Sequence, residues 1–283
     1  MKNRDDEIFQ FNKLSRLHDG EKIIFCKTDY LKSEFQNIEK KKNKVILMSG
    51  NSDYAVTESN VAFTPWAMNP TTEHLPDNVH HWFCTNNLTN HPRITSLPLG
   101  LDNDSMALRD GHGVGWDHAI QKREILSSLF CNDTGNEITG MIYANFTIST
   151  NSDWRSSVAS ACQDNDFITY DKHRTEYKEF ISQILSHKMV VCPLGNAPQL
   201  QSDNHRIYET LYCNRVPIVF LQNQSKLYES IYSKLPVVIL NDLEDLYKED
   251  KIIEIYEKVK NNPVDLIKYS FWRNKILQKA GEI

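Results

Sequence analysis

The sequence predicts an α/β protein with two domains built on parallel sheets, and three features support this prediction. Short continuous apolar runs recur along the 283 residues, and such runs are typical of strands buried on both faces of a parallel sheet. Segments of helical length separate the runs, as parallel crossovers require. Several runs end in polar loops, which is where parallel sheets bind their ligands.

The chain is long enough for two domains of ordinary size. We expect a first domain over residues 1–138, which ends in the polar stretch 131–138, and a second domain over residues 139–262. The tail, residues 263–283, is predicted to be an amphipathic helix. Analogy with two-domain proteins of this shape suggests that this helix crosses back onto the first domain.

The apolar runs place four strands in the first domain and five in the second. The first four are expected at residues 22–26, 44–48, 80–85 and 94–97. The other five are expected at residues 141–148, 167–170, 189–192, 217–221 and 237–239. Helices are predicted at residues 30–40, 116–130, 154–162, 177–186, 225–230 and 242–258, and another between Asp203 and Asn214.

The segment from Ser186 to Leu221 is the most informative part of the sequence. It predicts a strand, a polar loop, a helix and a second strand. Pro193 ends the first strand, because proline has no N–H to donate to the ladder. Asp203 is a suitable N-cap for the helix, and Asn214 suits the left-handed position that follows the helix C-terminus.

Arg206 and Glu209 lie three residues apart in this helix, so they share one face near its N-terminus. A helix N-terminus favours anions, and arginine presents a planar fork of donors to phosphate oxygens. A carboxylate one turn along can accept hydrogen bonds from a ribose, so the pair suits a nucleotide diphosphate. The alternative is a solvated helical ion pair, worth only about 0.5 kcal/mol. The buried strands on both sides favour the first interpretation.

The same segment resembles the exostosin-like glycosyltransferases (family 47). The resemblance rests on Cys-Pro-x-Gly at 192–195, on Asp203, on Arg206-x-x-Glu209 and on Val-Pro-Ile-Val at 216–219. It implies two Rossmann-like domains of the GT-B type that face a cleft, a nucleotide-sugar donor and inversion at the anomeric carbon. Within the family, the short chain is most similar to the small xylosyltransferases with which large algal viruses (chloroviruses) build capsid glycans.

The resemblance implies that the second domain binds the donor. Arg155 is the second predicted diphosphate ligand, because the family places an arginine near the start of this domain; a surface arginine is the alternative. The full set of predicted donor-binding residues is Asn145, Arg155, Gly195, Asn204, His205, Arg206 and Glu209.

The first domain is expected to bind the acceptor and to supply the catalytic base. Asp53 follows a predicted strand in a polar loop, where a carboxylate can reach an acceptor hydroxyl; a turn-forming aspartate is the alternative. Glu73, His80 and His81 are the other candidates for the base. The predicted acceptor-binding residues are Tyr54, Trp66, Glu73 and His80.

Composition and charge narrow the range of binding partners and cellular compartments that we expect for the protein. The formal net charge is −5 with acids and bases interspersed, so no nucleic-acid-binding face is expected. No apolar run is long enough to span a membrane, and the N-terminal stretch is not a signal peptide. The six cysteines show no metal-ligand spacing, which suits a reducing compartment. We expect a cytoplasmic protein, in the host cytoplasm if viral, that is a monomer or a weak dimer.

Two Asp-x-Asp triplets could mark a metal-dependent transferase. Asp102-Asn103-Asp104 is predicted to be a loop turn, and Asp164-Asn165-Asp166 precedes its strand instead of ending it. We therefore expect no metal and no other cofactor, with a UDP-sugar as donor substrate. UDP-xylose is the first choice of donor, and a glycan hydroxyl, with fucose as the first choice, is the acceptor.

The alternative functions are a nucleotide-sugar epimerase and a non-catalytic binding protein. A nucleotide-sugar epimerase would need Gly-x-Gly-x-x-Gly after the first strand, and residues 22–30 have no such motif. A non-catalytic protein that binds carbohydrate or nucleotide on the same fold would keep the site and lack turnover.

Overall fold

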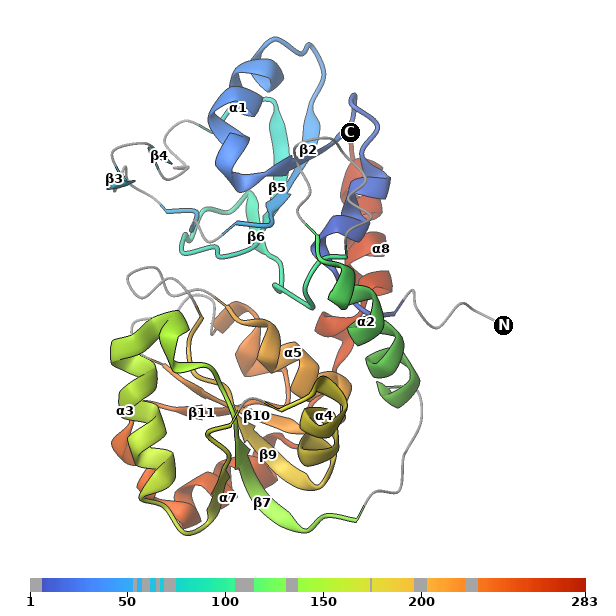
Figure 1. The fold of residues 1–283 in the computed structure, drawn as a ribbon. Helices are drawn as coiled ribbons and strands as arrows, with labels where there is room; N and C mark the ends of the chain where they lie inside the picture. Colours follow the sequence, from blue (N-terminus) through green and yellow to red (C-terminus); the bar gives the residue numbers. More distant parts are fainter. Residues whose placement is uncertain are drawn as a thin grey trace. The chain divides into compact units, whose positions relative to one another are not determined.

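The computed structural model describes residues 7–52, 55–57, 62–64, 67–68, 75–104, 115–130, 137–173, 175–195, 203–221 and 229–283. The chain divides into two units, one formed by residues 1–124 together with 265–283 and the other by residues 125–264 (Figure 1). Each unit carries its own parallel sheet, as the α/β prediction required. The division falls inside helix α2 (Asp117–Phe130), whereas the sequence predicted it at 138; most of the predicted linker lies outside the described residues.

The first unit contains a four-stranded sheet in which every pair of neighbours is parallel, in the order β1-β2-β5-β6. These strands are β1 (Ile23–Lys27), β2 (Val45–Gly50), β5 (Val79–Cys84) and β6 (Ile94–Ser96). Two short strands, β3 (Ala62–Thr64) and β4 (Ala67–Met68), form a separate antiparallel pair. All six residues of β2 are buried, as expected for a strand covered on both faces.

Side chains of this sheet alternate between two apolar clusters. Ile24 belongs to the cluster on the side of α1 (Leu31–Glu39), and Phe25 belongs to the cluster on the side of α8 (Tyr269–Ala280). Consecutive strands wind in one direction, and right-handed crossovers then place connecting helices on one face only. The two ends of the chain cover the other face: η2 (Phe11–Leu17) and α8 pack there (Figure 1). The predicted return of the C-terminal helix to the first sheet is confirmed.

The second unit contains a five-stranded parallel sheet in the order β11-β10-β9-β7-β8. Its strands are β7 (Gly140–Ala144), β8 (Ile168–Tyr170), β9 (His187–Val191), β10 (Val216–Phe220) and β11 (Val238–Leu240). The chain passes from β7 to β8 on one side and then crosses back to β9 on the other. The strand order therefore reverses between β7 and β9.

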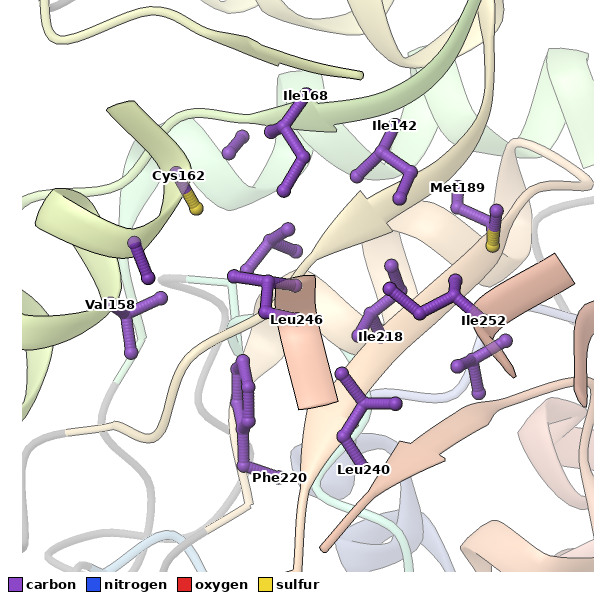
Figure 2. Close-up of a cluster of buried hydrophobic side chains, with 14 of the residues drawn as sticks. Ile142, Val158, Cys162, Ile168, Met189, Ile218, Phe220, Leu240, Leu246 and Ile252 are labelled. Carbon is purple, nitrogen blue, oxygen red and sulfur yellow. The ribbon is translucent and has the colours of Figure 1, made fainter. Parts of the chain in front are cut away.

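This reversal distributes the helices over both faces of the sheet. Alternate strand residues, among them Ile142, Met189 and Ile218, pack with residues of α3 (Ser152–Gln163) and α7 (Glu249–Val259) (Figure 2). On the other face, α4 (Tyr177–Leu185) lies against β9 and α5 (His205–Tyr212) against β10. Short 3₁₀ turns complete the chain: η3 (Thr28–Tyr30), η5 (Ile148–Asn151), η6 (Tyr232–Lys234), η7 (Glu244–Tyr247) and η8 (Asp265–Ile267).

Several expected boundaries differ from those observed, and two of these differences are the following. The strand predicted at residues 141–148 ends at Ala144, so Asn145 is the first residue of the following loop. The helix predicted at residues 242–258 is interrupted at Lys248, between η7 and α7. Both differences are at element ends, where local sequence pattern is least informative.

The five described cysteines are buried and free. Burial raises the pKa of Cys162 and of Cys192 to about 12, so neither thiol ionises near neutral pH. Within the described ranges, every helix is too short or too polar to cross a lipid bilayer.

Candidate functional site

The carboxyl ends of β7 and β9 form the candidate site. Open parallel sheets bind ligands beyond the carboxyl ends of their strands, at the point where the strand order reverses. In the second unit this point lies between β7 and β9. The loop that begins at Asn145 follows β7, and Cys192 to Gly195 follow β9. The predicted donor-binding residues all lie in these loops, in the first turn of α3, or in α5 and the residue before it.

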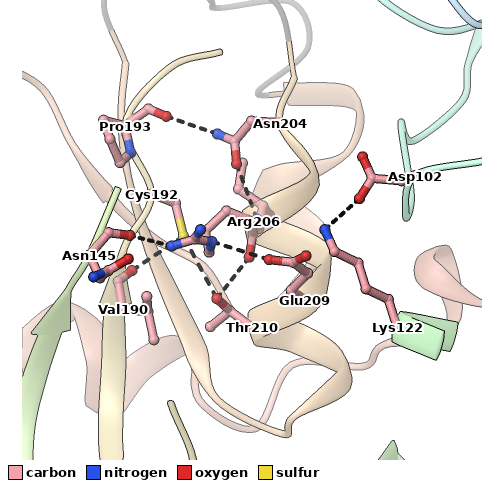
Figure 3. A network of polar contacts seen from close by, with 11 residues as sticks. Asp102, Lys122, Asn145, Val190, Cys192, Pro193, Asn204, Arg206, Glu209 and Thr210 are labelled. Carbon is pink, nitrogen blue, oxygen red and sulfur yellow. Dashed lines mark hydrogen bonds and ion pairs between the residues drawn. The ribbon is translucent and has the colours of Figure 1, made fainter. Parts of the chain in front are cut away.

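Arg206 lies in the first turn of α5 and reaches across to the end of β7 (Figure 3). Its Nη1 donates to the carbonyl of Asn145, and its Nε lies 3.1 Å from Oε2 of Glu209. The Arg206 side chain is 27% exposed and that of Glu209 is 4% exposed. The arginine is therefore the more exposed member of the pair. The predicted i,i+3 pair is present and is half-buried instead of solvated.

Arg155, in the first turn of α3, points to the same edge. Its Nε donates to the carbonyl of Leu194 at 2.8 Å, and its Nη1 donates to the carbonyl of Thr147 at 2.7 Å. Burial, followed by the positive charge of Arg206, lowers the pKa of Arg155 to about 10. The guanidinium stays charged at neutral pH. Its described partners are neutral carbonyls, so its charge is not compensated by a described carboxylate.

Two predicted donor-binding side chains hold the loops in place. Asn145 Nδ2 donates to the carbonyls of Asp171 and His173, at 3.0 and 2.8 Å, which ties the loop after β7 to the loop after β8. Asn204 Nδ2 donates to the carbonyl of Pro193 at 3.2 Å, and Asn204 Oδ1 accepts from the N–H of Ile207. These amides orient the site, and their donor atoms are occupied by the fold.

Asn204, and not Asp203, is the N-cap of α5; the cap prediction was wrong. Both residues have suitable side chains, and they are adjacent, so the sequence could not separate them. Two further predicted residues lie close by. His205 is half-buried and begins α5, and the carbonyl of Gly195 accepts from Asn151 Nδ2 at 3.3 Å.

Asp203 has a different role that the sequence analysis missed. Its carboxylate is buried and accepts hydrogen bonds from the hydroxyls of Tyr208 and Tyr232. Burial is the main cause that raises the pKa of Tyr232 well above its usual value, with the charge of Asp203 second. The contact joins the start of α5 to η6. No local pattern indicates it, because Tyr232 lies 29 residues away.

Most of the first-domain predictions lie outside the described residues: Asp53, Tyr54, Trp66 and Glu73. His80 is the second residue of β5, at the amino end of that strand, and its Nε2 is 3.3 Å from Oε2 of Glu282. This position is at the end of the strand opposite the carboxyl edge. His81 Nε2 pairs with Thr95 Oγ1 at 2.8 Å; burial, followed by the charge of Lys279, lowers the pKa of His81 to about 4.

An amide cluster at the carboxyl edge of the first sheet was also missed. Asn103 Nδ2 donates to Asn51 Oδ1 at 2.8 Å, and Asn103 Oδ1 accepts from the N–H of Asn12 at 2.9 Å. Asn51 and Asn86, which follow β2 and β5, have positive φ angles of 56° and 51°. Asparagine tolerates that conformation well, and Asn-rich strand ends are the signal that could have identified this cluster.

Both carboxylates of the first Asp-x-Asp triplet, and the asparagine of the second, are engaged in the fold. Asp102 Oδ2 pairs with Lys122 Nζ at 2.6 Å (Figure 3), and Asp104 pairs with Arg123. In the second triplet, Asn165 Nδ2 donates to the carbonyl of Leu246 at 2.9 Å. Among the described residues, no group of three or more His, Cys, Asp or Glu side chains is arranged to hold a metal ion.

No family model and no curated protein sequence matches the chain. Solved structures are similar to it, among them the following three. An α1,3-fucosyltransferase is 11% identical with a TM-score of 0.41, over 93% of this chain and 91% of that one. An α,α-trehalose-phosphate synthase (UDP-forming) from Burkholderia vietnamiensis is 10% identical with a TM-score of 0.46, over 96% and 75%. TarM is 10% identical with a TM-score of 0.45, over 95% and 57%.

Proposed function

We propose that this chain is a glycosyltransferase whose nucleotide-sugar donor binds at the carboxyl ends of β7 and β9. One observation carries the proposal. Two guanidinium groups, Arg155 and Arg206, meet at the switch point, and Glu209 is the one described carboxylate paired with either of them. Like charges held together in a half-buried place are costly unless an anion joins them. A diphosphate supplies that anion.

The residues then have separate roles. Arg155 and Arg206 donate to the diphosphate oxygens and stabilise the negative charge that develops as the nucleotide leaves. Glu209, one turn along α5, accepts hydrogen bonds from the ribose. His205 and the backbone of Gly195 border the same ligand. Asn145 and Asn204 keep the two loops at the correct spacing through their bonds to carbonyls.

The proposed catalytic base, stereochemistry and substrates follow from the sequence resemblance. Asp53 takes the proton of an acceptor hydroxyl while that oxygen attacks the anomeric carbon from the side opposite the departing UDP, which inverts the configuration. The proposed donor is UDP-xylose, and the proposed acceptor is a hydroxyl of a glycan, with fucose as the first choice. Tyr54, Trp66 and Glu73 are proposed to contact this acceptor. Leaving-group stabilisation is assigned to the arginines without a metal.

Calorimetric titration with UDP and GDP tests the donor site, with Arg206→Ala as the decisive variant. Arg206→Ala should weaken nucleotide binding roughly ten- to a hundred-fold, because charge-assisted hydrogen bonds contribute about 1.5–3 kcal/mol. Arg215→Ala is the matched control: its guanidinium donates to the carbonyl of Leu185, and affinity should not change. Equal nucleotide affinity in wild type and Arg206→Ala would reject the site. Nucleotide binding without transfer from any UDP-sugar would favour the non-catalytic alternative.

A further inference from the structure

The guanidinium of Arg206 lies on an aromatic ring. Its Cζ is 4.0 Å from the ring centroid of Phe180, a residue of α4 that is 4% exposed. Two edges of the same guanidinium are already in use, one by the carbonyl of Asn145 and one by Glu209. The group is thus fixed on one face and on two edges, and no described residue accepts from Nη2.

The ring of Phe180 is itself held in place by its neighbours. Tyr143 of β7 lies with its ring centroid 6.2 Å away, and Tyr177 of α4 with its ring centroid 6.1 Å away, both tilted at about 40° to it. Tyr143 is fully buried. Phe180 is thus packed against two further rings and contacts Arg206 from the face of the sheet opposite α3.

We propose that Phe180 is a positioning residue for the anion site: its ring holds the Arg206 guanidinium flat and in place, with its free donors presented to the ligand. This inference rests on the proposed function. The negative face of an aromatic ring attracts a guanidinium, most strongly where water is excluded. Holding the side chain before the ligand arrives also lowers the entropy lost on binding. The ring further offsets the repulsion between Arg206 and Arg155.

The support is specific to arginine at position 206. A guanidinium is planar and weakly hydrated, so it can stack on a ring while its edges donate hydrogen bonds. A lysine ammonium is a compact, strongly hydrated charge and cannot do both. Arg206→Lys should therefore lose most of the affinity that Arg206→Ala loses, although the charge is retained.

A double-mutant cycle between Phe180 and Arg206 tests the proposal, with UDP as the probe. Phe180→Leu keeps an apolar side chain and removes the ring. It should weaken UDP binding roughly 3- to 30-fold in the wild-type chain, and by no more than about two-fold in the Arg206→Ala chain. Ile184→Val is the matched control. It removes one methyl group from the same helix at a fully buried position, and UDP affinity should stay at the wild-type value.

The outcomes separate this inference from the proposed function. If Arg206→Ala weakens UDP binding and Phe180→Leu does not, the donor site stands and the positioning role is rejected. If Phe180→Leu weakened UDP binding equally in the wild-type chain and in the Arg206→Ala chain, the positioning role would also be rejected, because the ring would then act only by stabilising the fold. If neither UDP nor GDP binds the wild type, both proposals are rejected.

Fluorinated phenylalanines provide a second test that does not change the packing. Incorporation of mono-, di- and trifluorinated phenylalanine at position 180 keeps the shape of the ring and weakens its negative face step by step. UDP affinity should fall with each added fluorine. An affinity that stays constant across the series would overturn the proposal even if Phe180→Leu fails to fold.

Discussion

Single charged side chains decide the properties of the candidate site. Arg155 and Arg206 are fixed by carbonyls, by a carboxylate and by a ring, and none of these partners removes the charge of Arg155. Glu209 neutralises one of the two guanidiniums. The remaining charge is available to an anion, and the exposed fraction of Arg206, 27%, is enough for contact with a ligand.

The proposed role of Asp53 as catalytic base is tested by Asp53→Asn. This change removes the proton acceptor and keeps the size of the side chain, so turnover should fall by a factor of about 10² or more. UDP affinity should be unchanged, because the proposed donor site lies in the other unit. Initial rates with UDP-sugars and calorimetry with UDP measure the two effects. A variant with normal turnover would remove Asp53 from the mechanism, and Glu73→Gln would then be examined in the same way.

The local sequence pattern predicted the contacts or the backbone conformation of some residues and not of others. The spacing of Arg206 and Glu209 predicted their ion pair, and the type of Asn214 predicted its left-handed conformation, φ 55°. The stacking of Phe180 on Arg206 and the bond from Tyr232 to Asp203 were not predictable, because they join residues far apart in the sequence. Such contacts are set by packing of whole elements, which no local pattern records.

At the scale of single elements, the C-terminus of α5 depends on Asn214. The residue is exposed and has a positive φ, so its contribution is to backbone conformation. Asn214→Ala should lower the free energy of unfolding by about 1 kcal/mol, because alanine is disfavoured in that region. Asn214→Gly is the control and should unfold within about 0.5 kcal/mol of the wild type. Urea denaturation compares the two, and an alanine variant as stable as the glycine variant would contradict the explanation.

The start of α7 depends on a buried carboxylate. Asp245 accepts from Lys248 Nζ at 2.8 Å and from Lys251 Nζ at 2.6 Å, and its side chain is 2% exposed. Hydrogen bonds from these two lysines, Lys248 first, lower the pKa of Asp245 from 3.8 to about 2. The stability that this shift contributes is present above pH 3.8 and is lost as the pH falls towards 2.

Asp245→Asn removes the negative charge that both lysines contact, so it should lower the free energy of unfolding at neutral pH. The expected loss is only about 1–2 kcal/mol, because the lysines are partly exposed and solvent weakens the interaction. The difference from wild type should shrink as the pH falls below 3.8. Urea denaturation at several pH values measures it. Glu254→Gln is the control, since Glu254 and Lys258 are both about two-thirds exposed, and stability should hardly change. If the stability difference between Asp245→Asn and the wild type did not change with pH, the assigned role of the charged Asp245 carboxylate would be contradicted.

At the scale of the whole molecule, the first unit depends on the last helix. Ile276 of α8 is fully buried in the apolar cluster that contains Phe25 and Met48. Ile276→Ala should cost about 2–5 kcal/mol of stability through lost burial and the cavity left behind. Leu277→Ala, one residue along at 37% exposure, is the control and should cost much less.

The same substitution tests the independence of the two sheets. The described core of the second unit contains no residue of α8. At a temperature where Ile276→Ala is still folded, its UDP affinity should equal that of the wild type. A weaker affinity would show that damage to the first core reaches the donor site. Denaturation curves and calorimetry at one temperature give both quantities.

The strand order explains why the fold class was predictable while the site needed the structure. Buried apolar runs in β2, β9 and β10 predicted parallel sheets directly from sequence. The reversal between β7 and β9 does not appear in any single run, because it depends on the order in which strands pair. Arg155 and Arg206 lie at one edge of the second sheet only because β7 pairs with β9.

The placement of α8 also has a consequence for synthesis on the ribosome. Residues 125–264 form a continuous stretch with its own core, so that unit can fold as soon as it leaves the exit tunnel. The unit that begins the chain needs residues 265–283 to close one face of its sheet. The unit that contains residues 1–124 is therefore expected to mature after the later unit, and its uncovered apolar face is exposed to chaperones until residues 265–283 have been synthesised.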